Sequence, residues 1–303
     1  MTHGPAGADG GQVALHRGYL NRAALASPGA AVRFALSSAG YLLLVLGAGV
    51  MLIPIFWMVS TSLKPLNEIF SLPVQWWPAE PRWENYANAW NRFPFGRYFT
   101  NSIIVSLAVT IINVLLSGFA GFALAKYRFF GKNVLFIAIL ATLMLPIEVL
   151  MVPTFLIVKE LNWLNTYQGL IIPAAADAFG VFLMRQTIIH VPDSLLEAAR
   201  IDGASEVRIY FQIVLPLLWP AVLTLALFVW RETWDAFVWP LLITSQDALR
   251  TVPIGLQRFS EENVTNHNEV MAMSFVAMLP LAILFFIFQR AFIQGIAGTG
   301  IKE

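Results

Sequence analysis

The sequence FALSSAGYLLLVLGAGVMLIPIFWMVSTSL, residues 34–63, contains no charged side chain. About 20 apolar residues let a helix cross the hydrocarbon of a bilayer, so this stretch predicts a membrane-spanning helix. It is too long for the apolar segment of a signal peptide and no small-residue cleavage site follows it, so we expect it to be retained. Only 12% of the 303 residues are charged, against about 25% in soluble domains. Pattern and composition together indicate an all-α membrane protein.

Five further apolar stretches predict five more spans, giving six transmembrane helices. They are Tyr98–Ala125, Asn133–Val158, about Gly169–Ile189, about Ile209–Ile243 and Val270–Gln289. Prolines interrupt the third and fifth stretches, which membrane bundles tolerate where neighbouring groups satisfy the freed carbonyls. We therefore expect a tail at residues 1–33, a membrane domain at 34–295 and a second tail at 296–303.

Lysines and arginines divide unequally between the two sides of this six-span pattern. The side that holds both termini carries Arg17, Arg22, Arg33, Lys126, Arg128, Lys132, Arg185, Arg200, Arg208, Arg290 and Lys302. The other side carries fewer: Lys64, Arg82, Arg92, Arg97, Lys159, Arg250 and Arg258. Because basic residues are enriched in cytoplasmic loops, we expect both termini to face the cytoplasm.

Several classes of function are disfavoured by the residues that are missing. The chain has no cysteine, which excludes disulfides, thiol nucleophiles and thiolate metal sites, and its four histidines are too scattered for a metal cluster. Gly131-Lys132 is followed by Asn133 and lacks the upstream glycine of a phosphate-binding loop. A net charge of +1 gives no reason to expect nucleic acid as a partner. No nucleophile–base pair assembles, so we expect no catalysis by this chain.

The polar stretch between the predicted fourth and fifth spans, about residues 191–207, predicts a short cytoplasmic helix. Ser194 and Glu197 have the spacing of a capping box, and Gly203 is placed to end the helix in a left-handed turn. The two alanines after Glu197 leave one face nearly flat, so that a partner could approach closely. From these residues alone, a protruding lever and a well-capped connecting helix are both open.

A resemblance favours the lever. The residues fall at the spacing of the Glu-Ala-Ala signature loop of ATP-binding-cassette importer permeases, and the docking set comprises Glu197, Ala198, Ala199, Asp202, Gly203, Ile213, Leu215 and Pro216. The resemblance implies that this coupling helix docks into a cleft on an ATP-binding subunit and transmits its closure.

The resemblance extends from about residue 60 to 303 and is closest to the maltose-type carbohydrate permeases. Its further motifs are Asn85-Tyr86, Phe95–Tyr98, Asn101-Ser102, Ala123–Gly131, Thr251–Leu256, Gln289-Arg290, Gly295, Gly298 and Lys302. It implies a sugar importer of the bacterial inner membrane with a second homologous permease, two copies of an ATP-binding subunit and an extracytoplasmic solute-binding protein. ATP and Mg would bind those partners, and no cofactor or metal would bind this chain.

Two alternatives stay open beside a sugar importer. Glycerol-phosphate permeases resemble this chain closely, so glycerol phosphate is a rival substrate. An ion-coupled secondary transporter would be expected to show an inverted repeat with broken helices in matching halves, and no repeat is visible.

Charged residues inside the predicted spans are candidates for the substrate path, because each costs at least about 2.5–3.5 kcal/mol at mid-membrane. In the fifth span Arg231 and Asp235 can pair, beside Glu232 and Trp234. The family's usual amide after this tryptophan is here an acid. The set could hold a sugar, or it could bond the helix to a partner permease or lie at the outer interface.

Glu148 in the third span and Asp177 in the fourth are weaker candidates. Each could line the path or satisfy backbone groups freed by neighbouring prolines, and we favour the second role.

Overall fold

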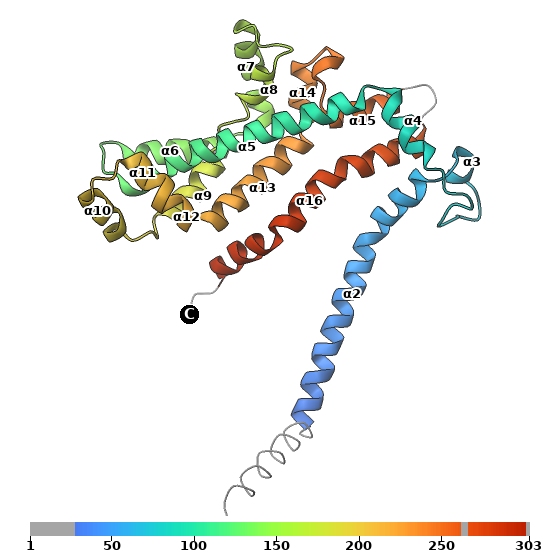
Figure 1. The fold of residues 1–303 in the computed structure, drawn as a ribbon, viewed down its shortest axis with the longest axis horizontal. Helices are drawn as coiled ribbons and strands as arrows, with labels where there is room; N and C mark the ends of the chain where they lie inside the picture. The colour runs from blue at the N-terminus through green and yellow to red at the C-terminus, as the bar shows by residue number, and fades with distance from the viewer. Residues whose placement is uncertain (1–27, 262–265, 301–303) are drawn as a thin grey trace, which may run out of the picture. The chain divides into compact units, whose positions relative to one another are not determined.

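The structure, a computed structural model, describes residues 28–261 and 266–300, so residues 1–27 of the first predicted tail and 301–303 of the second lie outside the described residues. Every regular element in these two ranges is helical (Figure 1). The prediction of an all-α protein is thereby confirmed. The chain divides into two units, residues 1–57 and 58–303, and each is described by itself.

The first unit contains most of α2 (Pro28–Ser62). Residues Leu36–Ser62 form a candidate membrane span with a mean hydropathy of 2.5, in agreement with the predicted first span. Its apolar side chains from Tyr41 to Ile53 are exposed, Met51 to 80%. Such a surface suits lipid or another apolar partner rather than water.

Two other predicted spans are also single long helices. The second span corresponds to α5 (Phe95–Lys126) and the sixth to the apolar part of α16 (His267–Gly300), which runs from His267 to Gln289. In Figure 1, α13 (Trp219–Asp235) lies between them, and it packs against both.

The third predicted span is bent. It forms α6 (Lys132–Thr142) and α7 (Ile147–Glu160), whose axes differ by 101°. Pro146 precedes α7 with an extended ψ of 134°. Proline disfavours helical conformation in the residue before it, which explains why the helix stops ahead of this position.

The fourth predicted span, Gly169–Ile189, is not one long helix. The chain there forms α8 (Tyr167–Ile171) and, after an irregular segment, α9 (Ala178–Ile188). Pro173 falls in this segment, and Asp177 starts α9 as its N-cap. By length and composition the described residues offer three spans, or five if each bent pair counts as one. The described residues therefore do not confirm the predicted count of six spans.

The fifth predicted span is a series of shorter helices. It runs through α11 (Glu206–Ile209), the π-helical turn η1 (Tyr210–Val214), α12 (Leu215–Leu217), α13 and α14 (Val238–Ile243). The part before Leu218 and α13 meet at 86°. Pro216 supplies a physical cause, because its ring would clash with the carbonyl of Gln212, and a wide π turn gives that carbonyl room.

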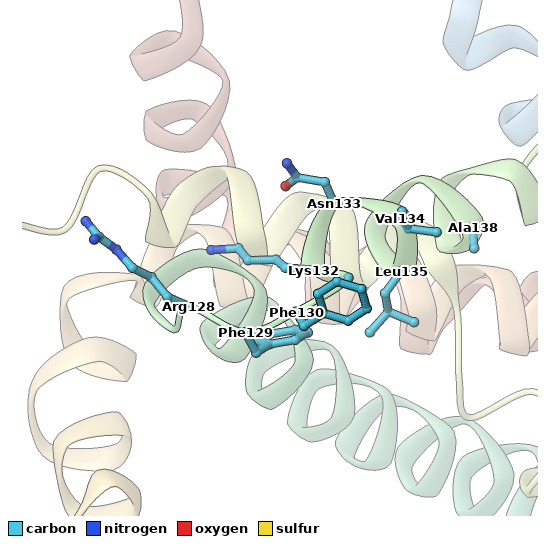
Figure 2. Close-up of a pocket in the computed structure, with 9 residues that line it drawn as sticks. Arg128, Phe129, Phe130, Lys132, Asn133, Val134, Leu135 and Ala138 are labelled. Atoms are coloured by element: carbon cyan, nitrogen blue, oxygen red, sulfur yellow. The ribbon is translucent and has the colours of Figure 1, made fainter.

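A tight turn joins α5 to α6. Gly131 has a φ of 77° and forms the N-cap of α6, a left-handed conformation that glycine adopts without steric cost. The residues of this turn and the first turns of α6 line a concave pocket (Figure 2).

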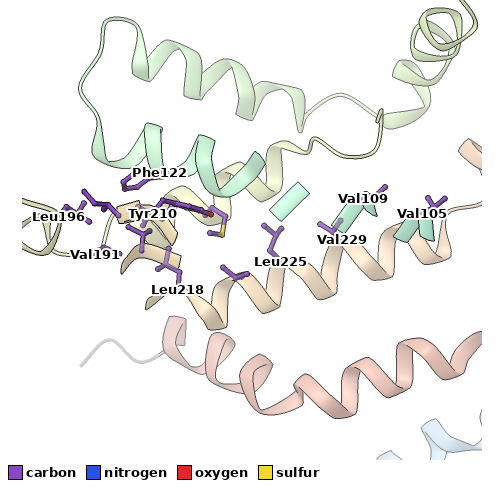
Figure 3. Close-up of a cluster of buried hydrophobic side chains, with 14 of the residues drawn as sticks. Val105, Val109, Phe122, Val191, Leu196, Tyr210, Leu218, Leu225 and Val229 are labelled. Atoms are coloured by element: carbon purple, nitrogen blue, oxygen red, sulfur yellow. The ribbon is translucent and has the colours of Figure 1, made fainter. Parts of the chain in front are cut away.

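Close backbone approach holds α5 against α9 and η1. A Cβ atom on Gly118 would collide with the hydroxyl of Tyr210, and one on Gly121 would lie 2.8 Å from the backbone nitrogen of Arg185. Around this junction lies the larger apolar core, in which Phe122, Tyr210 and Leu196 lie near one end (Figure 3). Leu196 belongs to α10 (Asp193–Ile201), so this core reaches the predicted cytoplasmic helix.

The opposite end of α5 packs on a second core with α4 (Glu84–Arg92), α15 (Val252–Glu261) and α16. The Asn101 amide donates at 2.9 Å to the carbonyls of Ala248 and Arg250, which flank the end of the short helix η2 (Asp247–Leu249). The backbone N–H of Val252 donates to Ser102 Oγ at 2.8 Å. The remaining short helix is α3 (Leu66–Ile69).

Candidate functional site

The start of α10 differs from the predicted capping box. Pro192 is the N-cap, with an extended ψ of 131°, and the first helical residue is Asp193. Ser194 therefore lies inside the first turn, where its backbone is already helical. A capping box requires a non-helical serine or threonine one position before the helix, so Ser194 and Glu197 cannot form one.

The end of α10 is the predicted glycine stop, which is confirmed. Gly203 has a φ of 79°. Its N–H donates to the carbonyl of Arg200 at 3.0 Å, and the N–H of Ala204 donates to the carbonyl of Ala199 at 2.9 Å. These two bonds form a Schellman motif, which satisfies the last carbonyls of the helix.

The two faces of α10 have different surroundings. Leu196 and Ala199 are buried in the larger core, whereas Leu195, Ala198 and Ile201 are exposed, Ile201 to 86%. The two alanines therefore do not share one flat exposed face, because consecutive helical residues point in directions about 100° apart. The remaining predicted residues of this helix, Glu197 and its C-cap Asp202, are exposed.

Lys126, the last residue of α5, holds the start of α10. Its ammonium group donates to the carbonyl of Val191 at 2.5 Å and to that of Ile189 at 3.3 Å, and it pairs with Asp193 Oδ1 at 2.8 Å. The Lys126 side chain is nearly buried, whereas that of Asp193 is exposed. Its hydrogen bond and charge hold the pKa of Asp193 below the usual range.

Tyr127, the next residue, contacts the other end of the α10 segment. Arg200 and Glu206 form a two-bond ion pair with distances of 2.7 and 3.2 Å. Burial, and then a hydrogen bond to Glu206, raise the pKa of Tyr127 to about 12. The hydroxyl is thus protonated at physiological pH and donates to the carboxylate. Lys126, the last residue of α5, and Tyr127, its C-cap, therefore contact both ends of the α10 segment.

The rest of the predicted signature follows α11. Ile213 lies in η1 and Leu215 begins α12, and both are partly buried against the larger core. Pro216 is exposed in α12. The signature residues thus lie along residues 193–217, where α10 is joined to the bent fifth predicted span, and we call this segment the corner.

The charged set at the end of α13 is arranged differently from the prediction. Arg231 and Asp235 pair at 3.6 Å as predicted, with 64% and 54% of their side chains exposed, and Glu232 is exposed beside them. Trp234, however, is 4% exposed and donates to the carbonyl of Ala277 in α16 at 3.1 Å. The tryptophan therefore faces the core and does not border the charged face.

The two weaker candidates lie apart from this set. Glu148 is exposed in the first turn of α7. Asp177 caps α9, and its two carboxylate oxygens accept from the N–H groups of Phe179 and Gly180 at 2.9 Å each. Within the described ranges, no three His, Asp or Glu side chains lie close enough together to hold a metal ion.

Sequence reasoning missed the residues that position the corner. Lys126 was used only for the orientation and, with Tyr127, for the resemblance, and nothing in the sequence shows which segment these two residues contact. Tyr210 was also missed, although it is fully buried against Gly118. A further omission is Lys64, fully buried directly after the first span, whose ammonium donates to the carbonyl of Gln75 at 2.5 Å. The sequence did contain a signal for Lys64, because it is the first charged residue after the uncharged stretch 34–63.

The comparisons with known proteins agree with this architecture. An arabinooligosaccharide transport system permease protein of Halalkalibacterium halodurans is 38% identical over 68% of this chain and 74% of its own length. An sn-glycerol-3-phosphate transport system permease protein of Pectobacterium atrosepticum is 34% identical over 86% and 95%. A bacterial ABC transporter involved in the import of alginate contains a chain with the same fold. That chain is 23% identical, with a TM-score of 0.77 over 88% of this chain and 98% of its own.

The decisive match is to a family. The sequence model of the family described as binding-protein-dependent transport system inner membrane component matches residues 114–298, which include α9, α10 and the whole signature loop. The chain therefore belongs to this family of inner-membrane transport components.

Proposed function

We propose that the chain is one permease subunit of an ATP-driven importer, and that the α10 segment is its coupling helix. The supporting observation is the exposed face of α10, which presents Leu195, Ala198 and Ile201, while Lys126 and Tyr127 hold the two ends of the segment. Exposed apolar side chains on a rigid helix suit a cleft in a partner protein. If an ATP-binding subunit closed on this helix, its movement would be transmitted to α5 and to the fifth predicted span, because α10 is attached to both.

The broken helices are consistent with a chain that pairs with a second permease subunit. We propose six membrane crossings, with the discontinuous α8–α9 segment as the fourth and both termini in the cytoplasm. Irregular backbone at membrane depth is stable where it is buried in protein or lines a cavity. A second homologous permease would cover such surfaces, two ATP-binding subunits would carry the ATP and Mg, and a solute-binding protein would deliver the substrate.

The charges on α13 favour an uncharged substrate. Arg231 is already paired with Asp235, and Glu232 adds a second acid to the same exposed region. If this face borders the path, it is net negative and would repel a phosphate group, whereas carboxylates accept hydrogen bonds from sugar hydroxyls. The arabinooligosaccharide relative points to the same class of substrate. We therefore propose a sugar or oligosaccharide as the substrate.

Glycerol phosphate is the second candidate because a relative that covers more of this chain is a glycerol-phosphate permease. The two substrates can be separated with the cognate solute-binding protein. Its binding to arabinooligosaccharides, other sugars and glycerol 3-phosphate should be measured by calorimetry, followed by uptake of the tightest ligand into proteoliposomes that contain the assembled transporter and ATP. Sugar uptake that requires ATP supports the proposal. Uptake of glycerol 3-phosphate alone would replace the substrate, and uptake without ATP would contradict the coupling.

A further inference from the structure

The turn between α5 and α6 forms a cavity that the transport proposal does not use. Its volume is about 830 Å³, which lies within the range of about 300–1,000 Å³ found for ligand sites. The lining residues come from one continuous stretch: Arg128, Phe129, Phe130, Gly131, Lys132, Asn133, Val134, Leu135 and Ala138.

One side of the cavity is cationic. Figure 2 shows the Arg128 and Lys132 side chains pointing to the same side. Lys132 donates to the carbonyls of Tyr127 at 2.9 Å and Ala125 at 3.2 Å, whereas Arg128 is exposed and forms no hydrogen bond or ion pair with the described part of the chain. The lining contains no carboxylate. Asp193 lies within electrostatic range of Arg128, but the two form no ion pair, so the guanidinium keeps N–H groups available to a phosphate.

The other side is apolar and open. Phe130 is fully exposed and Val134 largely so, and Phe129 and Leu135 are about half exposed. In Figure 2 the two aromatic rings and Leu135 lie away from the cationic ends. A ligand that fits both sides carries an anionic head and a hydrocarbon tail.

The position of the turn identifies such a ligand. The candidate span of α5 ends at Lys126, and the next apolar helix begins at Lys132. With α5 and α6 in a membrane, residues 127–131 would lie at its surface, at the level of the lipid headgroups. Basic pockets between membrane helices bind anionic headgroups.

We propose that this cavity is a binding site for an anionic phospholipid. Arg128 contacts the lipid phosphate, assisted by the charge of Lys132, while Phe130 and Leu135 contact the acyl chains. The proposal depends on α5 and α6 being membrane helices, and it is independent of the transported substrate.

The test compares two lipids with the same acyl chains. The assembled transporter is delipidated in detergent and titrated with phosphatidylglycerol or phosphatidylcholine, and bound lipid is counted by native mass spectrometry. Arg128→Gln should weaken phosphatidylglycerol binding about fivefold, the factor that corresponds to about 1 kcal/mol for each cation near the surface. It should leave phosphatidylcholine binding unchanged.

Three further variants separate the contributions. Arg128→Lys should keep most of the preference for phosphatidylglycerol, and Phe130→Ser should weaken both lipids by a similar factor. Arg97→Gln, which removes an exposed arginine from the first turn of α5, should change neither.

Four outcomes would overturn the proposal. These are equal binding of the two lipids to the parent, unchanged phosphatidylglycerol binding in Arg128→Gln, and displacement of the lipid by millimolar inorganic phosphate, which would indicate a site for free anions. The fourth is loss of a protein subunit from the Arg128→Gln complex with lipid binding intact, which would make the turn a protein interface.

Discussion

The charged groups around α10 form short ion pairs and backbone hydrogen bonds within the chain, whereas those at the end of α13 form one long, exposed ion pair. Around α10, Lys126 and Arg200 form ion pairs of 2.8 and 2.7 Å, and Lys126 also bonds to backbone carbonyls. At the end of α13, Arg231 and Asp235 are 3.6 Å apart and mostly exposed. The chain itself fixes the geometry of the first region.

This difference indicates what each region needs from its surroundings. An exposed charged side chain in a membrane helix cannot face lipid without a large cost, so it faces a water-filled cavity or another protein. If α13 lies in the membrane, its charges would therefore face a cavity, another protein or the outer interface, whereas the groups around α10 are held by contacts within this chain. Substitutions around α10 should mainly change stability and the coupling of ATP hydrolysis to transport. Substitutions at the end of α13 should mainly change the binding of a substrate or of a partner subunit.

Gly203→Pro should have the largest effect and abolish transport. Proline cannot adopt the φ of 79° at this position, and it removes the N–H that bonds to the carbonyl of Arg200. ATP-driven uptake into proteoliposomes measures the loss. Gly203→Asn is the matched control, because asparagine tolerates the left-handed conformation and should keep most activity. Uptake near the parental rate in the proline variant, at normal expression, would argue against a role for the corner.

Gly118→Ala should loosen the packing between α5 and η1. The new methyl group collides with the Tyr210 hydroxyl, and overpacking a core typically costs about 1–3 kcal/mol. The thermal midpoint of the purified complex measures the change. Tyr210→Phe should be well tolerated by itself, because its buried hydroxyl has no hydrogen-bond partner, and it should partly rescue the alanine variant. A double variant no better than Gly118→Ala would refute the contact.

Lys126→Met should reduce transport several-fold without preventing membrane insertion. The substitution removes bonds from a charged, nearly buried donor, each worth about 1.5–3 kcal/mol. Asp193→Asn removes only the exposed half of the ion pair, for which about 0–1 kcal/mol is typical. The ratio of ATP hydrolysed to sugar transported should therefore rise in the methionine variant and stay constant in the asparagine variant. Equal effects of the two would show that the carbonyl bonds are unimportant.

Asp235→Asn should have the smallest effect and act on recognition. An amide both donates and accepts hydrogen bonds, so the apparent affinity for sugar should change by a few-fold at normal complex yield. Leaving Arg231 unpaired costs little where the pair is exposed to water. A poor yield of the complex would instead assign the pair to the interface with the second permease. Normal yield with unchanged kinetics for every sugar would exclude both roles.

The sequence predicted long helices better than broken ones. Uncharged runs identified the first, second and sixth spans, because hydrophobicity and length alone decide such helices. The break at Pro146 and the irregular segment before Asp177 depend on which residues end one helix and cap the next. Counting apolar residues does not detect such breaks. Gly203 was identifiable as a stop because a positive φ favours glycine. The partners of Lys126 were not, since they lie 63 to 67 residues away in the chain.

The central claim is that the exposed face of α10 docks on an ATP-binding subunit. Because the chain contains no cysteine, Ala198→Cys introduces a unique thiol on that face, and Ala199→Cys introduces one on the buried face as a matched control. The assembled transporter should be treated with a short thiol-to-amine cross-linker and the products identified by mass spectrometry. We predict a cross-link from position 198 to the ATP-binding subunit and little or none from position 199. Absence of a cross-link from position 198 in an active complex, or equal yields from the two positions, would contradict the docking of α10.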